Sequence, residues 1–171
     1  MNTKTVIEAF DSFCEAQGID KFEFEGDSAV RQFGEDGAVL TVRLDAEAGS
    51  VTFVATLGEL PSDFLPVAFR TMLSANFGWQ AAGAATFAWC EPIGQPVLQL
   101  RVPGDGLDAE SIGRELQPFL SAVEKWRKAL VEAADGYGEE ENGEFGGVAT
   151  AEELGPAIKD APAADEFVIR G

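Results

Sequence analysis

The spacing of apolar residues constrains the fold most, because it switches along the chain between a helical and a strand period. Apolar side chains recur every three or four residues in segments 6–17, 65–77 and 112–130. This is the period of a helix with one buried side. Elsewhere, apolar and polar residues alternate with period two, which predicts strands with one buried face. These alternating runs cover residues 22–25, 40–44, 51–57, 85–90 and 96–102.

The order of these segments predicts an α+β domain, α-β-β-β-α-β-β-α, with a twisted antiparallel sheet. Residues Asp45–Ser50 separate two alternating runs with a turn, so those two strands should form a hairpin. Asp108 is a suitable N-cap for the last helix. Pro118 falls inside that helix, where we expect it to kink or split the helix. We expect residues 1–133 to make up this domain.

The chain changes character in its last part, residues 134–171. Residues 136–143 are rich in glycine and glutamate, a composition typical of a flexible linker. Thr150–Glu153 fits a capping box and predicts a short helix. The apolar run Phe167–Ile169 is a candidate for docking on the domain. We therefore treat residues 134–171 as an acidic, glycine-rich linker and tail.

The charge of the chain argues against several classes of partner. Twelve basic residues oppose 30 acidic ones, giving a net charge of −18, and the chain has no histidine. Such a surface repels phosphate backbones and anionic headgroups, which disfavours nucleic acid and membrane partners. No apolar run approaches the ~20 residues that span a bilayer, and no signal peptide is evident. With Cys14 and Cys90 expected to be reduced, we predict a cytoplasmic protein.

Catalytic motifs are missing from the sequence. Without histidine, neither a Ser-His-Asp triad nor a Cys-His pair can form, and the commonest zinc ligand is absent. Carboxylates cluster at Asp105–Glu110, Glu35–Gly37 and Glu139–Glu141. The first cluster could bind a divalent cation or supply an acid/base pair, but all three also suit turns, a helix N-terminus or a solvated linker. We predict no catalytic residue, metal ligand or cofactor, and an enzyme acting through its carboxylates is the least favoured alternative.

Large aromatic side chains gather between the second predicted helix and the strand that follows it. Asn76–Trp79 is followed closely by Phe87 and Trp89. Such a group fits an ordinary core or a self-association surface, since aromatic residues are enriched at interface centres. Small residues over Ala81–Ala85 would let two backbones approach. A helix beside an edge strand can also pair with its symmetry mate, as a two-fold dimer requires, and we favour the interface.

Short motifs through the middle of the chain resemble a known family in their order and spacing. Gly58–Pro61, an apolar helix and Leu73–Phe77 are similar to the "LG-LP … LL-ANF" centre of the Tir-chaperone family, the class I chaperones of bacterial type III secretion systems. Ala85–Ala88 resembles the G-A-T-L-x-L strand of that family. The resemblance covers roughly residues 3–131 and continues through Val97–Leu100, Gly106–Glu110 and Trp126-Arg127.

This resemblance implies a homodimer that binds the N-terminal export region of a secreted effector in non-globular form. It also implies that the protein uses no ATP and performs no reaction, and it makes the secretion ATPase a further candidate partner. The tail is longer than the family core requires, so no role is carried over to it, and we hypothesise that it covers an effector groove. The second helix and the following strand would form the dimer contact, with candidates Phe69, Met72, Asn76, Phe77, Thr86 and Phe87.

Two modes of partner binding are physically reasonable for such a fold. An extended segment can add a strand to an exposed sheet edge, and apolar side chains can enter a groove between the first helix and the sheet. The residues that we expect to line this groove, named below, would also fit an ordinary core, and this alternative stays open. The main alternative function is a general dimeric protein-binding adaptor of the same fold with no secretion role. The candidate effector-binding residues are Val6, Phe10, Phe13, Leu40 and Val42.

Overall fold

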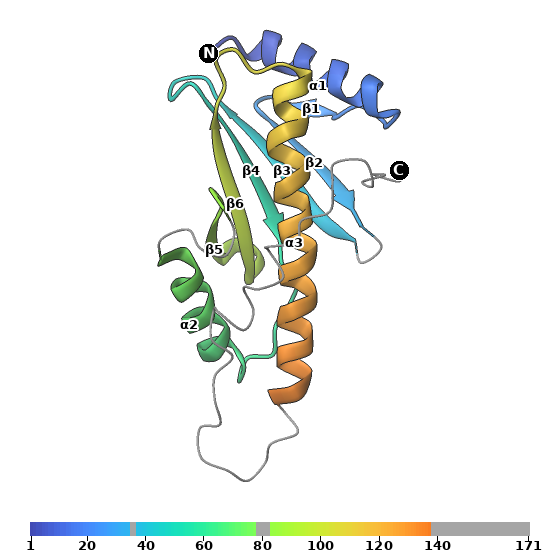
Figure 1. Cartoon of the computed structure of the whole chain (residues 1–171). Helices are drawn as coiled ribbons and strands as arrows, with labels where there is room; N and C mark the ends of the chain where they lie inside the picture. Colours follow the sequence, from blue (N-terminus) through green and yellow to red (C-terminus); the bar gives the residue numbers. More distant parts are fainter. Residues whose placement is uncertain (35–36, 78–82, 138–171) are drawn as a thin grey trace.

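The computed structural model describes residues 1–34, 37–77 and 83–137 (Figure 1). Six antiparallel strands form one sheet in the order β1-β2-β3-β4-β6-β5. None of the helices in these ranges is long and apolar enough to cross a membrane. In chain order the elements are α1 (Thr3–Gln17), β1 (Phe24–Glu25), β2 (Ser28–Phe33), β3 (Ala38–Asp45), β4 (Ser50–Thr56), α2 (Leu65–Asn76), β5 (Thr86–Cys90), the 3-10 turn η2 (Glu91–Ile93), β6 (Gln95–Pro103) and α3 (Ala109–Tyr137).

The predicted α+β fold is confirmed, with one strand more than the sequence indicated. The additional strand is β2, which pairs with β3 along its whole length. Its polarity pattern hides it, because Val30 is 65% exposed while Arg31 points to the buried side. The guanidinium carbon of Arg31 lies 5.5 Å from the ring centre of Phe22, and its Nη1 donates a hydrogen bond to the Asp20 carbonyl at 2.6 Å. Stacking and hydrogen bonding therefore let a charged residue occupy an inward position.

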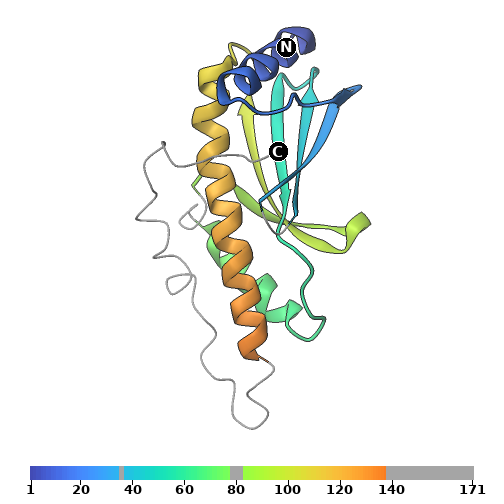
Figure 2. The same ribbon diagram turned by 90° about the vertical axis from the view of Figure 1, so that its right-hand side faces the viewer.

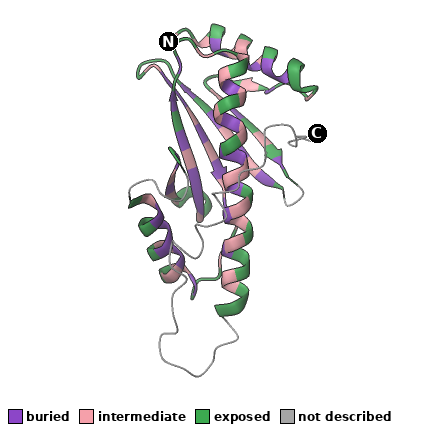
Figure 3. Ribbon diagram, in the orientation of Figure 1, coloured by how far each residue is buried: buried purple, intermediate pink, exposed green. Residues whose placement is uncertain are grey.

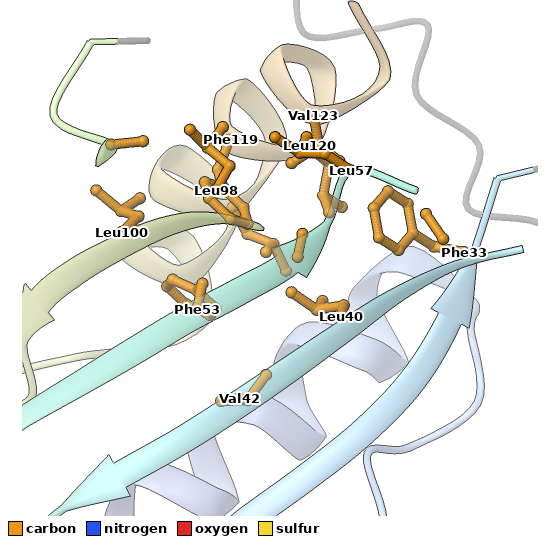
Figure 4. Close-up of a cluster of buried hydrophobic side chains, with 14 of the residues drawn as sticks. Phe33, Leu40, Val42, Phe53, Leu57, Leu98, Leu100, Phe119, Leu120 and Val123 are labelled. Atoms are coloured by element: carbon orange, nitrogen blue, oxygen red, sulfur yellow. The ribbon is translucent and has the colours of Figure 1, made fainter. Parts of the chain in front are cut away.

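Both long helices lie on the same side of the sheet (Figure 2). Buried residues alternate along the strands, as expected for a sheet with one covered face (Figure 3). Side chains from β3, β4, β6 and α3 meet in the core, among them Phe53 and Phe119, whose ring centres are 6.1 Å apart (Figure 4). The opposite face carries half-exposed residues such as Thr41, Val54 and Gln99, and no helix of the described ranges covers it.

Helix α3 is continuous through Pro118, so the proline does not split it. The apolar residues of α3 before and after Pro118 are buried, and this packing keeps both parts helical although proline lacks the N–H group. At its start, the Asp108 carboxylate accepts the Ser111 N–H at 2.8 Å, and the Asp108 N–H donates to Ser111 Oγ at 2.8 Å. The Ser111 N–H and the Ser111 hydroxyl both donate to this carboxylate and hold the pKa of the Asp108 carboxyl below its usual value. The buried stripe, no member of which is more than 3% exposed, is Ile112, Leu116, Phe119, Leu120, Val123, Trp126 and Leu130.

We predict that Phe10→Ala lowers the free energy of unfolding by about 3–5 kcal/mol, because it leaves a cavity between α1 and the sheet. The Phe10 ring meets Phe22, Phe24 and Phe53 at centroid distances of 5.4, 5.6 and 6.2 Å. Urea denaturation at a single protein concentration measures the change. Ile93→Ala, at an exposed position, is the control and should change stability by less than about 0.5 kcal/mol. Equal effects of the two substitutions would contradict this account of the core.

Candidate functional site

The five residues predicted to line an effector groove lie in the hydrophobic core. Three come from α1 and two from β3, and none is more than 2% exposed. Helix α1 sits directly on the sheet, and its aromatic side chains fill the space between the two layers. The interpretation of these residues as ordinary core is therefore the one that the structure supports. In the described structure they line no open groove, and a partner would have to displace α1 to reach them. These residues are Val6, Phe10, Phe13, Leu40 and Val42.

The residues predicted at the dimer contact come together where α2 packs beside β5. The Asn76 side chain accepts the Phe87 N–H at 2.7 Å and donates to the Phe87 carbonyl at 3.1 Å. Because β5 is the last strand of the sheet, these bonds occupy main-chain groups that would otherwise form an open edge. The rings of Phe69 and Trp89 pack edge to face, 5.1 Å apart. Asn76 thus fixes the helix to the strand.

Helix α2 has apolar residues on two sides, which is unusual for a helix that packs only on its own domain. Its inner side is buried and includes Ala68, Met72 and Ala75. Its outer side carries Leu73 at 69% exposure, and Phe77, which follows the helix, is 80% exposed. The helix therefore packs with one side on the domain and presents a second apolar side outward. We call the outward residues the α2 face: Leu65, Phe69, Leu73, Phe77 and Trp89.

Four residues of the α2 face, Leu65, Phe69, Leu73 and Trp89, line an apolar hollow of about 430 Å³ between α2 and β5. Of the six predicted contact residues, Phe77 is exposed, and Phe69, Asn76 and Thr86 are half-buried. Met72 and Phe87 are buried, so they support the face from below. The contact residues predicted from the sequence did not include Leu73, and Trp89 entered only as a member of the aromatic group. The four-residue spacing of Leu65, Phe69, Leu73 and Phe77 is a signal that would have found Leu73.

The other edge of the sheet is open along part of β2. Strand β1 pairs only with Ser28 and Ala29, and the described residues provide no partner for the rest of β2 on that side. The Leu44 N–H donates to the Asp27 carbonyl at 2.7 Å, so the main-chain groups of Asp27 point toward β3. Main-chain groups of an antiparallel strand point alternately to its two sides. Those of Val30 and Gln32, an odd number of residues after Asp27, therefore point away from β3. We call Val30 and Gln32, both exposed, the β2 edge.

The carboxylate clusters do not assemble a reactive site in the described part of the chain. No group of three or more His, Cys, Asp or Glu residues within it could hold a metal ion. Asp108 caps α3 as described above, and Asp105 pairs with the amino terminus at 3.6 Å. Burial raises the pKa of the Cys14 thiol, which disfavours the reactive thiolate. Residues 35–36 and 139–141, which belong to the other two clusters, lie outside the described residues.

The fold is shared with chains from three solved protein complexes. With the ExsC–ExsE complex, the TM-score is 0.65 at 21% identity, covering 75% of this chain and 95% of that chain. With the HopA1–SchA chaperone–effector complex, the TM-score is 0.58 at 14% identity, covering 75% of this chain and 98% of that chain. With the ExoU–SpcU complex from the type III secretion system of Pseudomonas aeruginosa, the TM-score is 0.52 at 19% identity, covering 74% of this chain and 98% of that chain. The described domain therefore shares its fold with chains of these three complexes.

The sequence places the chain within a family. The model of the Tir chaperone protein (CesT) family matches residues 8–127. This chain belongs to that family, and the resemblance drawn from its motifs is confirmed. A comparison with curated protein sequences finds no match. Membership of a chaperone family indicates a protein that binds other polypeptides.

We predict that Asn76→Ala lowers the free energy of unfolding by about 1–3 kcal/mol, because it leaves the Phe87 N–H and carbonyl without a partner where α2 covers them. Ser74→Ala, an exposed change on the same helix, is the matched control and should have little effect. Urea denaturation measures both variants. If both were as stable as the unaltered chain, Asn76 would not hold α2 on the strand edge.

Proposed function

We propose that this chain is a type III secretion chaperone that binds the N-terminal export region of an effector in non-globular form, keeping it soluble and competent for secretion. The observation that carries this proposal is the match of the chaperone family model over residues 8–127. The HopA1–SchA structure, a chaperone–effector complex, has the same fold. On this proposal the protein works in the cytoplasm by binding alone, without catalysing a reaction.

The β2 edge supports binding of an extended segment. Val30 and Gln32 offer outward main-chain groups beside an exposed apolar side chain. A partner strand added there gains main-chain hydrogen bonds regardless of most of its side chains. The opposite edge is already closed at Phe87 by Asn76. We therefore assign strand addition to the β2 edge, in place of the buried residues of the α1 layer.

The α2 face supports a homodimer. Exposed Leu73 lines an apolar hollow together with Phe69, and Phe77, which follows the helix, is exposed as well. A contiguous apolar surface of this kind usually marks an interaction site, and a two-fold axis would bring two copies of it together. The dimer contact and the partner strand would then use opposite edges of the sheet. One dimer would hold its partner at two places.

A general dimeric adaptor of the same fold, without a secretion role, is the second candidate. The surface features of the molecule serve either function equally. Co-expression with candidate effectors, followed by limited proteolysis of the purified complex, separates the two. Protection of an N-terminal effector stretch supports the secretion chaperone. A stable complex only with proteins that are not exported would favour the adaptor. Binding of the secretion ATPase can be tested with the same purified complex.

We predict that Gln32→Pro weakens binding of a co-purified effector segment about tenfold, because proline cannot donate the outward hydrogen bond. The pairing of β2 with β3 is spared, since proline is tolerated where the N–H of an edge strand faces solvent. Gln32→Thr is the matched control, because it also removes the long side chain but keeps the N–H. Calorimetric titration gives both affinities. Equal affinities for the two variants would rule out strand addition at this position.

We predict that Leu73→Asp converts a dimer into single 18.2 kDa chains, because it places a charge in the centre of the α2 face. Val30→Asp is the control, since Val30 has a similar exposure, 65% against 69%, but lies on the other edge of the sheet. Light scattering after size-exclusion chromatography measures the mass. An unaltered chain that is monomeric at micromolar concentration would overturn the proposed dimer.

A further inference from the structure

A groove separate from the α2 face runs beside the C-terminal half of α3. It has a volume of about 800 Å³, within the range of sites that bind small molecules or side chains. Its floor is formed by the core residues Phe33, Ala38 and Leu57. Charged residues of both signs surround this floor. They are Glu59, Glu124, Arg127, Lys128 and Glu132.

The walls of this groove are built from well-positioned groups. Arg127 Nη1 donates to the Thr56 carbonyl at 3.1 Å, which fixes its side chain beside the last residue of β4. Gly34 and Gly58 both adopt positive φ values, +70° and +95°, so the main chain lines the groove without side chains there. Val131 is 50% exposed on the α3 wall. The groove therefore combines an apolar surface, accessible backbone and charges of both signs.

The C-terminal segment of the chain has the chemistry to fill this groove. Beyond Tyr137, the single run of three consecutive large apolar residues is Phe167–Ile169. Asp165 and Glu166 precede it and Arg170 follows it. The negative pair matches the basic Arg127 and Lys128, and the arginine matches the acidic rim of the groove. Charge complementarity of this kind selects register and orientation more than it adds affinity.

The position of the groove also suits this segment. Glu132 lines it, and α3 ends at Tyr137, about 7.5 Å further along the axis at 1.5 Å per residue. Residues 138–164 would form the connection. A connection of that length can span up to roughly 90 Å when extended, so the tail can reach the groove from the end of α3. A covalent tether raises the effective concentration of the tail at the groove, so weak intrinsic affinity is enough for docking.

We infer that Phe167–Ile169 of this chain dock in the groove beside α3. The groove includes Phe33 and Gly34, which directly follow the β2 edge in sequence. Docking at this position would place the tail next to the strand edge to which the proposed function, on which this point rests, assigns partner binding.

Amide chemical shifts of the full chain and of a chain ending at Ala164 test the docking directly. Removal of residues 165–171 should shift the amides of Gly34, Ala38, Gly58 and Val131. A synthetic peptide of Pro162–Gly171, added to the shortened chain, should return them toward their original positions. Val131→Asp should abolish the response to the peptide. Ile93→Asp, equally exposed at 50% but distant in sequence from the groove residues, should leave the response intact.

The alternative outcomes each overturn the inference. Unchanged groove amides would show that the tail does not dock there, and shifts confined to the β2 edge or the α2 face would place it elsewhere. Shifts that depend on protein concentration would mean that the tail of a second copy occupies the groove. Effector binding is measured separately by co-purification. A chain that binds an effector but shows no groove shifts would therefore refute the tail docking and leave the proposed function standing.

Discussion

Burial of one side of α3 against the sheet is the interaction on which the other elements depend. Near its start, Gly113 lets the Phe13 ring of α1 approach closely. Further along, Trp126 meets Phe87 of β5 with ring centres 4.7 Å apart. At its end, Tyr137 packs on Phe64 beside α2, at 5.5 Å. One helix therefore sets the positions of α1, the sheet and α2. With each fully buried large side chain contributing about 1.5–3 kcal/mol, this stripe is a large part of the stability of the domain.

Periodicity predicted most of the fold because it reports directly which side of an element is buried. It located α1, α3 and the paired strands β3, β4 and β6, all of which have regular apolar stripes. It missed β2, since Val30 is exposed and Arg31 faces inward. The stacking on Phe22 that makes this arrangement favourable is a tertiary contact, and no local pattern reveals it.

The candidate sites were harder to predict than the fold, because periodicity does not say what an apolar residue packs against. Phe10 and Val42 suited a groove or a core equally, and they are core. Asn76 was associated with the dimer contact, yet its described hydrogen bonds are to Phe87 of its own sheet. Leu73 shares the four-residue spacing of Leu65, Phe69 and Phe77, but spacing alone does not say which side of α2 packs on the domain and which side is exposed.

The inward position of Arg31 has a consequence for how the molecule behaves in a crowded cell. Unpaired strands invite identical strands to join them, and proteins limit this by placing charges on the inner side of the outermost strand. Arg31 is such a charge, and Gly34 closes the strand with a left-handed turn. If two copies joined antiparallel at this strand with Arg31 opposite Arg31, two guanidinium groups would lie next to each other. The same strand can therefore receive a foreign polypeptide while resisting the stepwise growth of fibres from its own kind.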